Sequence, residues 1–564
     1  MGTDLLSIGK SAVAAQQLLL RTTSNNIANV ATGNYVRQRS VTTDSDVCLG
    51  VGAVITQRLN DVYKQQEVWR DTAGAAYHEA VYQQIHTVDQ YLSDSSIGLS
   101  ESMTQMFTSL ESAINNPISE SERAEFMSDL QAFTDRFHTL YDDIENVVKD
   151  NEMKIDEAVT QANDLIKSIA QFNNSIATAG KVRDSFYYNL VDQRDAAVAQ
   201  LAELLDIRTV PNKDNADVIG INLASGQTLV MVDSDLNKSV WGHLEAVPGY
   251  NDTSARELAV RFEGSTYLTK LGADFENVGG RIGGLLSCRR EINSSLAGIS
   301  QLAVSLAVNF NLQNSAGTDL IGNAGQDLFT LPNSAPVVND DEWCETCYGS
   351  GHIRYVVDPS AIEKFSDCSL CFKADNTGAI TACYQIMDDG SLSENPVNPA
   401  DYGIIVDTRA AWYYAEPNAT VTIKPAADVA RKLTLRTTDP RDLALSGSGM
   451  GPSDNSNGIL MSRLQNTPAV ANGRAYTGSG DLVSFTERYA TITSSLGSVA
   501  SSENIAYMAA DAKLEQSRAS YDSASGVSLD EEAAHLVQYQ QYYSAAAKII
   551  SAAQNTFQSL INVV

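Results

Sequence analysis

In this 564-residue chain, the residues whose spacing could support chemistry are the seven cysteines. Four of them form two Cys-x-x-Cys pairs, Cys344 with Cys347 and Cys368 with Cys371, and 20 residues separate the pairs. Four thiolates at this spacing suit a tetrahedral Zn²⁺ in a closed, structural site. Two disulfides are the alternative in an oxidising compartment, and free thiols are a third state. The pattern favours a structural zinc and leaves both alternatives open.

Three further cysteines and one histidine carry less information. Cys383 and His352 lie close to the paired cysteines in the sequence and are additional candidate ligands. Cys48 and Cys288 are isolated, and we expect them to be buried as small apolar side chains.

The rest of the chain lacks the short motifs of common catalytic sites. Its six histidines include no HExxH pair, and neither GxSxG nor GxxxxGK[ST] occurs. Glycines cluster at 279–284 before a predicted helix, but their spacing is not that of a phosphate-binding loop. We therefore expect no enzyme and assign no catalytic residue. A zinc-dependent activity in the cysteine-bearing segment is a remote alternative, because four-cysteine sites are usually closed.

Length and charge limit the remaining functions. The chain is too long for one hydrophobic core, so several domains are expected. It carries 39 basic and 69 acidic residues, a net charge of −30, which disfavours nucleic acid and anionic membranes as partners. We see no run of about 18 apolar residues that could span a bilayer and no basic, signal-like start. Export would then use a route without a cleaved signal.

The C-terminal segment has the clearest helical pattern. Apolar residues recur from Leu529 onward in steps of four and three, as along the seam of a coiled coil. We predict one long helix there, and we expect its apolar stripe to form an assembly interface. The residues chosen for this interface are Leu529, Leu536, Tyr543, Ile550, Phe557 and Leu560.

The N-terminal segment repeats the pattern. The same spacing predicts a helix that ends near 31–33, where Gly33 would permit a left-handed C-cap. The interface residues chosen on this helix are Leu5, Ile8, Ala12, Leu19, Asn26 and Asn29.

Neither terminal helix can bury its stripe alone. Each large apolar side chain left in water forfeits roughly 1.5–3 kcal/mol. Packing the two ends together, and both against neighbouring subunits, would remove this cost. An intramolecular hairpin on a globular body is the simpler alternative.

Between the ends, helical and strand-like stretches alternate. The predicted fold is multidomain: a mainly α stem, made of paired, coiled-coil-like terminal helices and a long helical bundle, with inserted β domains. The predicted domains are a terminal assembly domain (1–35 with 526–564), a helical stem (36–205 with 281–326 and 438–525), a small β subdomain (206–280) and a Cys-rich, mostly β outer domain (327–437).

Short segments at both ends resemble the axial proteins of the bacterial flagellum, which include rod, hook and hook-associated proteins. At the start the matching segments are 24–29 (SNNIAN), 32–35 (TGNY) and 37–39 (RQR). At the end they are 525–534 (SGVSLDEEAA), 539–543 (YQQYY) and 546–550 (AAKII). The family usually has a Pro-Gly turn where this chain has Gly33-Asn34.

Internal segments are similar to the branch of that family that forms the hook–filament junction. They are 192–195 (DQRD), 283–286 (GGLL), 309–313 (NFNLQ), 317–320 (GTDL) and 439–444 (DPRDLA). Nothing in about 330–437 resembles this branch.

The resemblance implies a structural subunit that joins hook to filament and polymerises through its terminal helices. It also implies type III export of the unfolded chain, so the mature protein would be secreted and extracellular, on the flagellum. The implied partners are further copies of the chain, the hook protein, the second junction protein and an export chaperone. Another axial protein (hook protein, second junction protein or flagellin-like protein) is the alternative. No cofactor is required, apart from the possible zinc.

Overall fold

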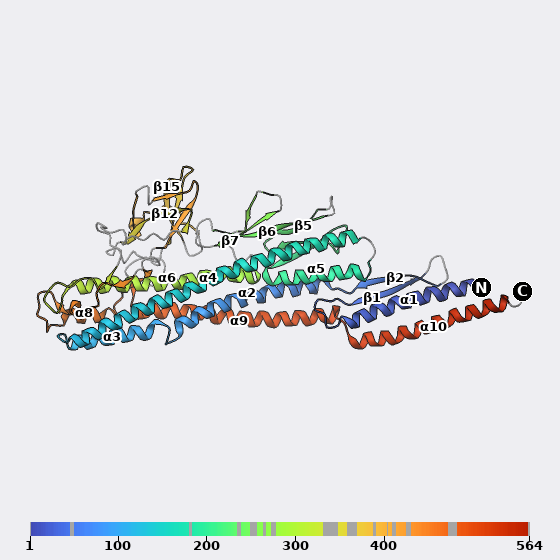
Figure 1. The fold of residues 1–564 in the computed structure, drawn as a ribbon, viewed down its shortest axis with the longest axis horizontal. Coiled ribbons are helices and arrows are strands. Elements are labelled where there is room, and N and C mark those ends of the chain that lie inside the picture. The colour runs from blue at the N-terminus through green and yellow to red at the C-terminus, as the bar shows by residue number, and fades with distance from the viewer. Residues whose placement is uncertain are drawn as a thin grey trace.

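The chain forms an elongated rod with both termini at one end (Figure 1). The computed structural model describes residues 2–44, 50–179, 183–233, 238–248, 256–262, 265, 267–271, 278–330, 348–357, 369–386, 391–402, 404–408, 413–424, 430–431, 433–471 and 482–561.

The terminal end of the rod consists of two long helices and one β-hairpin. α1 (Gly2–Ala28) packs beside α10 (Leu529–Ile561), and we call these two helices the terminal pair. β1 (Gln38–Asp44) and β2 (Val51–Arg58) form an antiparallel hairpin against α1. The predicted pairing of the two chain ends is therefore present within one chain.

The turn after α1 differs from the prediction in one residue. Asn34, with φ 62°, has the left-handed conformation there. Asparagine tolerates this conformation better than most residues because its short polar side chain can bond locally. Asn34 therefore supplies the left-handed conformation at the position where the Pro-Gly turn has its glycine.

The stem is a bundle of long helices. Its members are α2 (Val62–Ser93), α3 (Leu99–Asn115), α4 (Glu120–Ala179), α5 (Ser185–Leu204), α6 (Gly280–Ser315), the short α8 (Ser456–Arg463) and α9 (Phe485–Ser525). Side-chain caps start several of them: Asp61 caps α2, Asp184 caps α5, and Ser484 with Glu487 forms a capping box on α9.

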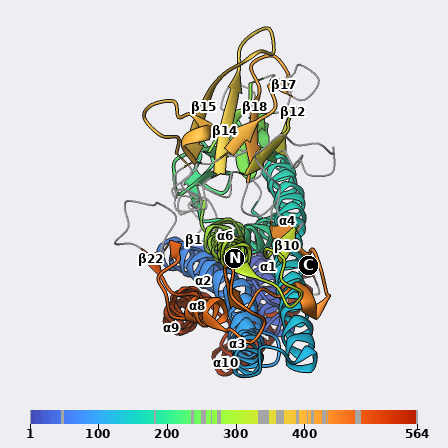
Figure 2. The same cartoon turned by 90° about the vertical axis from the view of Figure 1, so that its left-hand side faces the viewer.

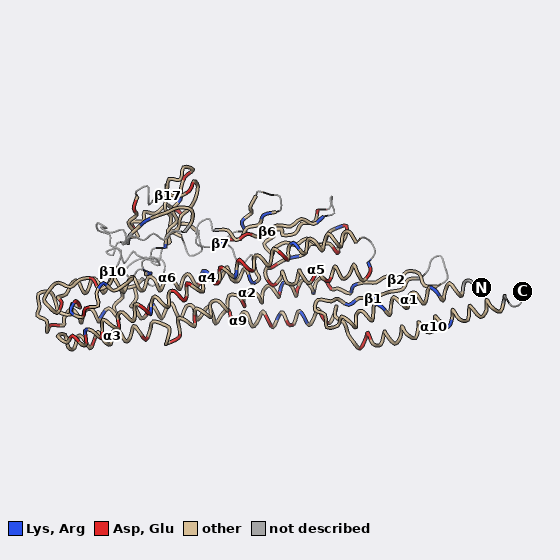
Figure 3. Tube along the Cα trace, in the orientation of Figure 1, with Lys and Arg blue, Asp and Glu red and all other residues tan. Residues whose placement is uncertain are grey.

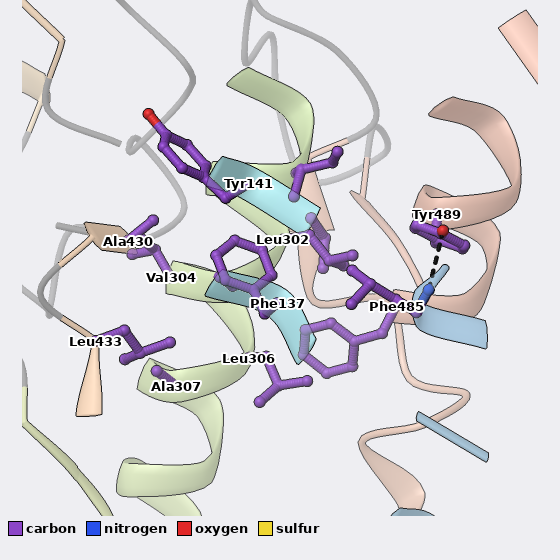
Figure 4. Close-up of a cluster of buried hydrophobic side chains, with 14 of the residues drawn as sticks. Phe137, Tyr141, Leu302, Val304, Leu306, Ala307, Ala430, Leu433, Phe485 and Tyr489 are labelled. Carbon is purple, nitrogen blue, oxygen red and sulfur yellow. Dashed lines mark hydrogen bonds between the residues drawn. The ribbon is translucent and has the colours of Figure 1, made fainter. Parts of the chain in front are cut away.

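The stem core is aromatic and aliphatic. Figure 4 shows Phe137 of α4, Leu302 and Leu306 of α6, and Phe485 and Tyr489 of α9 in one buried cluster. α6 is long and apolar enough to cross a membrane by length and composition, but 78% of its apolar window is buried inside the protein. It is therefore the central helix of the bundle.

A six-stranded antiparallel meander covers α4. Its strands, in spatial and sequence order, are β3 (Ile207–Pro211), β4 (Ile219–Leu223), β5 (Thr228–Asp233), β6 (Lys238–Pro248), β7 (Arg256–Phe262) and β8 (Thr269–Lys270). Alternate residues of β4 are buried, as expected for a sheet with one face on a helix. The Asn163 side chain of α4 fixes the sheet by exchanging two hydrogen bonds, 2.9 and 2.8 Å long, with the Leu244 backbone.

A second strand-rich region follows α6. One four-stranded sheet has the order β11-β18-β14-β15, and two-stranded ladders join β12 to β17 and β13 to β16. The bounds are β11 (Tyr348–Gly349), β12 (Gly351–Ile353), β13 (Tyr355–Val357), β14 (Ser369–Ala374), β15 (Ile380–Ile386), η4 (Pro399–Tyr402), β16 (Ile404–Val406), β17 (Tyr413–Ala415) and β18 (Thr420–Ile423).

Short ladders return the chain from this region to the stem. They pair β9 (Gly317–Thr318) with β20 (Ser446–Gly447), β10 (Phe329–Thr330) with β19 (Thr434–Leu435), and β21 (Val470–Ala471) with β22 (Leu482–Val483). The 439–444 segment contains η5 (Pro440–Asp442), and fully buried Arg123 donates to the Leu443 carbonyl at 2.5 Å. This segment therefore anchors the return strand.

Seen end-on, the inserted sheets lie on one side of the helices, and α9, α3 and α10 lie on the other (Figure 2). The predicted fold class, a mainly helical multidomain chain with inserted β regions, is confirmed. The two strand-rich regions fall within 206–280 and 327–437. The division into four domains with those boundaries stays a prediction.

Candidate assembly surface

Small side chains form the centre of the contact between α1 and α10. Ala15, Ala546 and Ala553 are at most 4% exposed. A Cβ added to Gly9 would lie 2.6 Å from Cγ1 of Ile550, closer than real Cβ contacts allow. The two helices thus approach closely because no bulky side chain separates them.

The predicted C-terminal seam lies beside this centre. Leu529, Leu536, Tyr543, Ile550 and Phe557 recur every seven residues and so share one flank of the contact. The buried residues of α10 belong to a different row: Glu532 near the stem, and Ala546 and Ala553 farther along the helix. The predicted seam is thus offset along this part of α10, because alanine allows a closer helix approach than leucine or tyrosine does.

The predicted C-terminal residues differ in exposure. Leu529 and Phe557 are 50% and 55% exposed, and Leu536, Tyr543 and Ile550 are half-buried against α1. The Leu560 side chain lies outside the described residues. The flank therefore contacts α1 at its centre and is open to solvent at both ends.

The N-terminal residues divide in a similar way. Leu5 is 43% exposed, Ile8 and Ala12 are half-buried, and Leu19 is buried. Asn26 is also buried: its amide donates to the Gln38 carbonyl at 2.7 Å, and its oxygen accepts from the Gln38 N–H at 3.0 Å.

Both predicted asparagines bond within their own chain. Asn26 pairs with the backbone of β1, and the amide of half-buried Asn29 donates to the Asn25 carbonyl at 2.9 Å. Asn26 is 1% exposed in the single chain, and its predicted place in the assembly interface stays a prediction. The side-chain amide of Asn26 pairs with both the carbonyl and the N–H of Gln38 in β1. The helical spacing did not indicate this pairing.

Large apolar side chains remain exposed on both helices of the terminal pair. They are 37–55% exposed and comprise Leu5, Leu6 and Leu18 of α1, and Leu529, Val537, Tyr542, Ile549 and Phe557 of α10. Charged residues are sparse along the same two helices (Figure 3). An exposed apolar surface of this kind indicates a contact with another protein surface.

A salt bridge joins the turn after α1 to the start of α10. Arg37 Nε donates to Oε1 of Glu532 at 2.7 Å, and Arg37 Nη1 donates to Oε2 of Glu531 at 2.7 Å. The Arg37 backbone N–H donates to the Ser525 carbonyl at 3.0 Å. The sequence analysis missed this contact, because only the 37–39 motif marked Arg37.

A buried polar cluster joins the β1–β2 hairpin to the stem. Arg58 of β2 contacts Asp192 and Asp195 of α5, each at 2.8 Å. The Gln65 amide of α2 donates to Asp195 at 3.1 Å. The 192–195 motif therefore connects the terminal end of the rod to the stem.

The two aspartates of this cluster differ in acidity. Burial raises the pKa of Asp192 to about 6, partly offset by Arg58. Burial also acts on Asp195, but Arg194 and Arg58 keep its pKa below the ordinary value. Asp195 is thus the more acidic carboxylate of the two, and it pairs with Arg58 and Arg194.

A cleft of about 550 Å³ lies between α2, α9 and the start of α6. Four of its titratable groups pair across α2 and α9: Asp71 with Lys513 at 2.8 Å, and His78 with Glu503 at 2.8 Å. Arg70 and Asp206 also line the cleft. The Ser517 hydroxyl also donates to Asp71, at 2.5 Å. These contacts stabilise the packing of the two helices.

The cysteine site falls mostly outside the described residues, which exclude Cys344, Cys347, Cys368 and also Cys48. Cys371 is buried in β14 opposite Tyr384. Among the residues that the structure describes, no group of three or more His, Cys, Asp or Glu could hold a metal ion. The choice between zinc, disulfides and thiols therefore stays open.

The additional candidate ligands do not join Cys371. Cys383 pairs with Phe372, one position beyond Cys371, so the two cysteines point to opposite faces of the sheet. Cys383 therefore does not lie beside Cys371, and its role as an additional candidate ligand stays untested. His352 of β12 instead stacks on Tyr414, with ring centroids 6.2 Å apart. Cys288 is fully buried, as predicted, and burial raises the pKa of its thiol to about 12.

Comparison with known proteins shows similarity to flagellar proteins along the whole chain. The family model described as "Flagellar hook-associated protein FlgK helical domain" matches residues 85–329, and "Flagellar basal body rod FlgEFG protein C-terminal" matches residues 518–563. "Flagellar hook-associated protein 1" of Escherichia coli (strain K12) is 27% identical over 575 residues, which span 100% of both chains. Over its whole length, the chain is similar to flagellar hook-associated protein 1.

Two further comparisons agree with this similarity. The protein of that name from Salmonella typhimurium is 26% identical over 586 residues, again 100% of both chains. A solved structure, described as the flagellar hook junction protein FlgK from Burkholderia pseudomallei, is 18% identical. It superposes with a TM-score of 0.64 over 82% of this chain and 100% of the other, so the two share a fold.

These similarities confirm the resemblance seen in the short segments. A hook-associated protein 1 is a structural component of the bacterial flagellum that assembles with other flagellar components into the axial structure.

Proposed function

We propose that this chain joins the flagellar hook to the filament and polymerises through its terminal pair. The observation that carries the proposal is the row of exposed apolar side chains on α1 and α10, at the end of the rod where both termini lie. A helix pair that is already closed within one chain has no further need of these side chains. A neighbouring subunit would remove them from water.

The energetic argument is simple. Fully burying one large apolar side chain stabilises a contact by roughly 1.5–3 kcal/mol. Eight such side chains are 37–55% exposed on the terminal pair. Burial of this surface against neighbouring copies would oppose the entropy lost on assembly. The two terminal helices therefore form a hairpin within one chain. Their exposed flanks support assembly with other chains in addition.

The proposed partners are further copies of the chain, the hook protein, the second junction protein and an export chaperone. Support comes from the similarity to flagellar hook-associated protein 1 and from the exposed apolar surface of α10, which a chaperone would cover before export. We propose no nucleic-acid or membrane partner, because the net charge is −30.

We propose that the chain is secreted through type III export and acts outside the cell without catalysis. Four titratable groups of the 550 Å³ cleft pair across α2 and α9, which supports a role in helix packing. The relatives are named flagellar hook-associated protein 1.

A structural zinc at Cys344, Cys347, Cys368 and Cys371 remains a proposal, with two disulfides as the alternative. Either link would form after export of the unfolded chain. Metal analysis of protein purified without a His-tag, with a thiol count after denaturation, separates the two. Absence of zinc together with four free thiols at these positions would contradict both.

The junction role is tested in a strain that lacks this chain. We expect cells that keep their hooks but shed flagellin monomers into the medium, and we expect the wild-type chain to restore attached filaments. Attached filaments in the deletion strain would contradict the proposed function. So would wild-type chain that is exported but absent from the hook tip.

A further inference from the structure

The outward face of α9 is free of charge over a long distance. Between Tyr489 and Ala510 the one charged residue is Glu503, which is half-buried and paired with His78. The exposed residues of this stretch are small or apolar: Ala490, Thr491, Ser494, Ser495, Ser498, Ser501, Ser502, Ile505, Met508 and Ala509. Twenty-two residues of helix are about 33 Å long. We call this exposed set the α9 ridge.

Two members of the α9 ridge are large. Ile505 is 67% exposed and Met508 is 64% exposed. They are three residues apart and therefore neighbours on one helix face. The remaining members are small, so a second helix could approach the ridge closely. This surface differs from a solvated helix face, which normally carries charged side chains.

The chain as a whole makes this absence of charge unusual. It has 69 acidic residues against 39 basic ones. Two copies of such a chain repel each other wherever their carboxylates meet. A close contact between copies is therefore favoured between two surfaces with few carboxylates. The α9 ridge is one such surface. The terminal pair is another, because its carboxylates are confined to Asp4 of α1 and to Asp530, Glu531 and Glu532 in the first turn of α10.

The position of the α9 ridge in the rod leaves it accessible. α9 and α10 lie on the side of the rod opposite the inserted sheets (Figures 1 and 2). A second copy could approach this side without meeting the inserted sheets. The length also suits a helical partner, since the 27 residues of α1 span about 40 Å.

We propose that the α9 ridge is a docking surface for the terminal pair of a second copy of this chain. Ile505 and Met508 would pack against the exposed leucines, Tyr542 or Phe557 of that copy. The inference rests on the proposed function, because both require copies that lie side by side. It adds a stem surface to an assembly that would otherwise use terminal helices alone.

The test is a double substitution, Ile505→Lys with Met508→Lys, in the full chain. Both side chains are exposed, so the monomer is expected to keep its thermal midpoint and its export. Occupancy of hook tips, counted by immunogold labelling, is expected to fall at least tenfold. Met153→Lys on α4 is the matched control, because Met153 is also exposed, at 63%. The control is expected to occupy hook tips as the wild type does.

The outcomes separate this inference from the proposed function. Hook tips that lack even the wild-type chain would overturn the proposed function. Hook tips that hold the double variant as well as the wild type would overturn the inference alone. An equal loss with Met153→Lys would also overturn it, since the effect would then not be specific to the ridge.

A photocrosslink identifies the occupant directly. Benzoylphenylalanine in place of Met508 is expected to give a covalent dimer in assembled flagella, with crosslinked peptides from α1 or α10 of the second copy. Crosslinks to a different segment, or to a different protein, would overturn the proposed occupant.

Discussion

Arg37 Nε lies 2.7 Å from Oε1 of Glu532, although 495 positions separate the two residues in the sequence. The Glu532 side chain is 3% exposed and that of Arg37 is 17% exposed. This contact, with the Arg37 N–H bonded to the Ser525 carbonyl, joins the turn after α1 to the beginning of α10. The terminal pair is therefore fixed at its stem end by a buried polar contact and along its length by small side chains.

Removing Glu532 is predicted to loosen α10 without unfolding the stem. Glu532→Ala leaves a half-buried guanidinium with one partner fewer, which costs roughly 1–3 kcal/mol. Hydrogen exchange of 529–561 should accelerate by about tenfold for each 1.4 kcal/mol lost. Exchange in α4 and α6 should not change.

Glu531→Ala is the matched control for this prediction. Glu531 contacts the same arginine at 2.7 Å, but its side chain is 60% exposed. An exposed ion pair contributes less than about 1 kcal/mol. Equal acceleration in the two variants would show that burial of Glu532 is not what stabilises the contact.

Gly9→Val is predicted to separate the terminal pair. A Cβ at this position would lie 2.6 Å from Ile550 Cγ1 and 3.3 Å from the Ile550 backbone nitrogen. Overpacking of this kind costs roughly 1–3 kcal/mol. Proteolysis should then cleave α10 faster, and Ile550→Ala should restore part of the protection by removing the nearest atoms.

Gly33→Ala serves as the control, since no atom lies within 4 Å of its added Cβ. Protease sensitivity of this variant should match the wild type. If the protease sensitivity of Gly9→Val also matches the wild type, the close approach of α1 and α10 at Gly9 is contradicted.

Stability of the junction between the β1–β2 hairpin and the stem is predicted to depend on pH through Asp192. The pKa of Asp192 is raised to about 6 from 3.8, so the folded state binds its proton before the unfolded state does. The stabilisation is complete below about pH 4 and is lost as the pH rises through 6. The free energy of unfolding changes through this group by at most about 1.4 kcal/mol per pH unit.

Asp192→Asn should remove this contribution. Urea unfolding between pH 4 and 7 would then show a free-energy difference between variant and wild type that changes with pH in the stated direction. Asp195→Asn should instead destabilise most at pH 7, because the lowered pKa of Asp195 gives a stabilisation that is lost on acidification. Parallel pH profiles for the wild type and both variants would contradict the assignment.

The sequence predicted the helices better than the contacts between them. Steps of three and four identified α1 and α10 because helical periodicity is a local property. The centre of their contact was missed because alanine and leucine are both apolar, and periodicity alone does not say which of two adjacent rows is innermost. Glu532 was missed for a different reason: its burial depends on Arg37, which only the fold brings close.

Contacts between separate elements also explain what the sequence did not indicate about Asn26 and Cys383. Asn26 was chosen for an interface because it continues the helical spacing, but its partner is the Gln38 backbone in a strand. Cys383 was considered beside Cys371 because the two are near in sequence, whereas strand register turns them to opposite faces. Recognition of the family needed neither contact, because the short motifs carry it.

Phe557→Asp is predicted to abolish incorporation into the flagellum while leaving the monomer folded. Phe557 is 55% exposed, so a charge there should change monomer stability by no more than about 0.5 kcal/mol. In an assembly the same carboxylate would be buried without a partner, at a cost of several kcal/mol. Asn555→Asp, at an exposed polar position two residues away, adds the same charge as a control. Hook-tip occupancy and thermal midpoint should be measured for both variants. Wild-type occupancy by Phe557→Asp would exclude the exposed α10 flank from the assembly contact, whereas an unfolded monomer would mean that Phe557 stabilises the single chain.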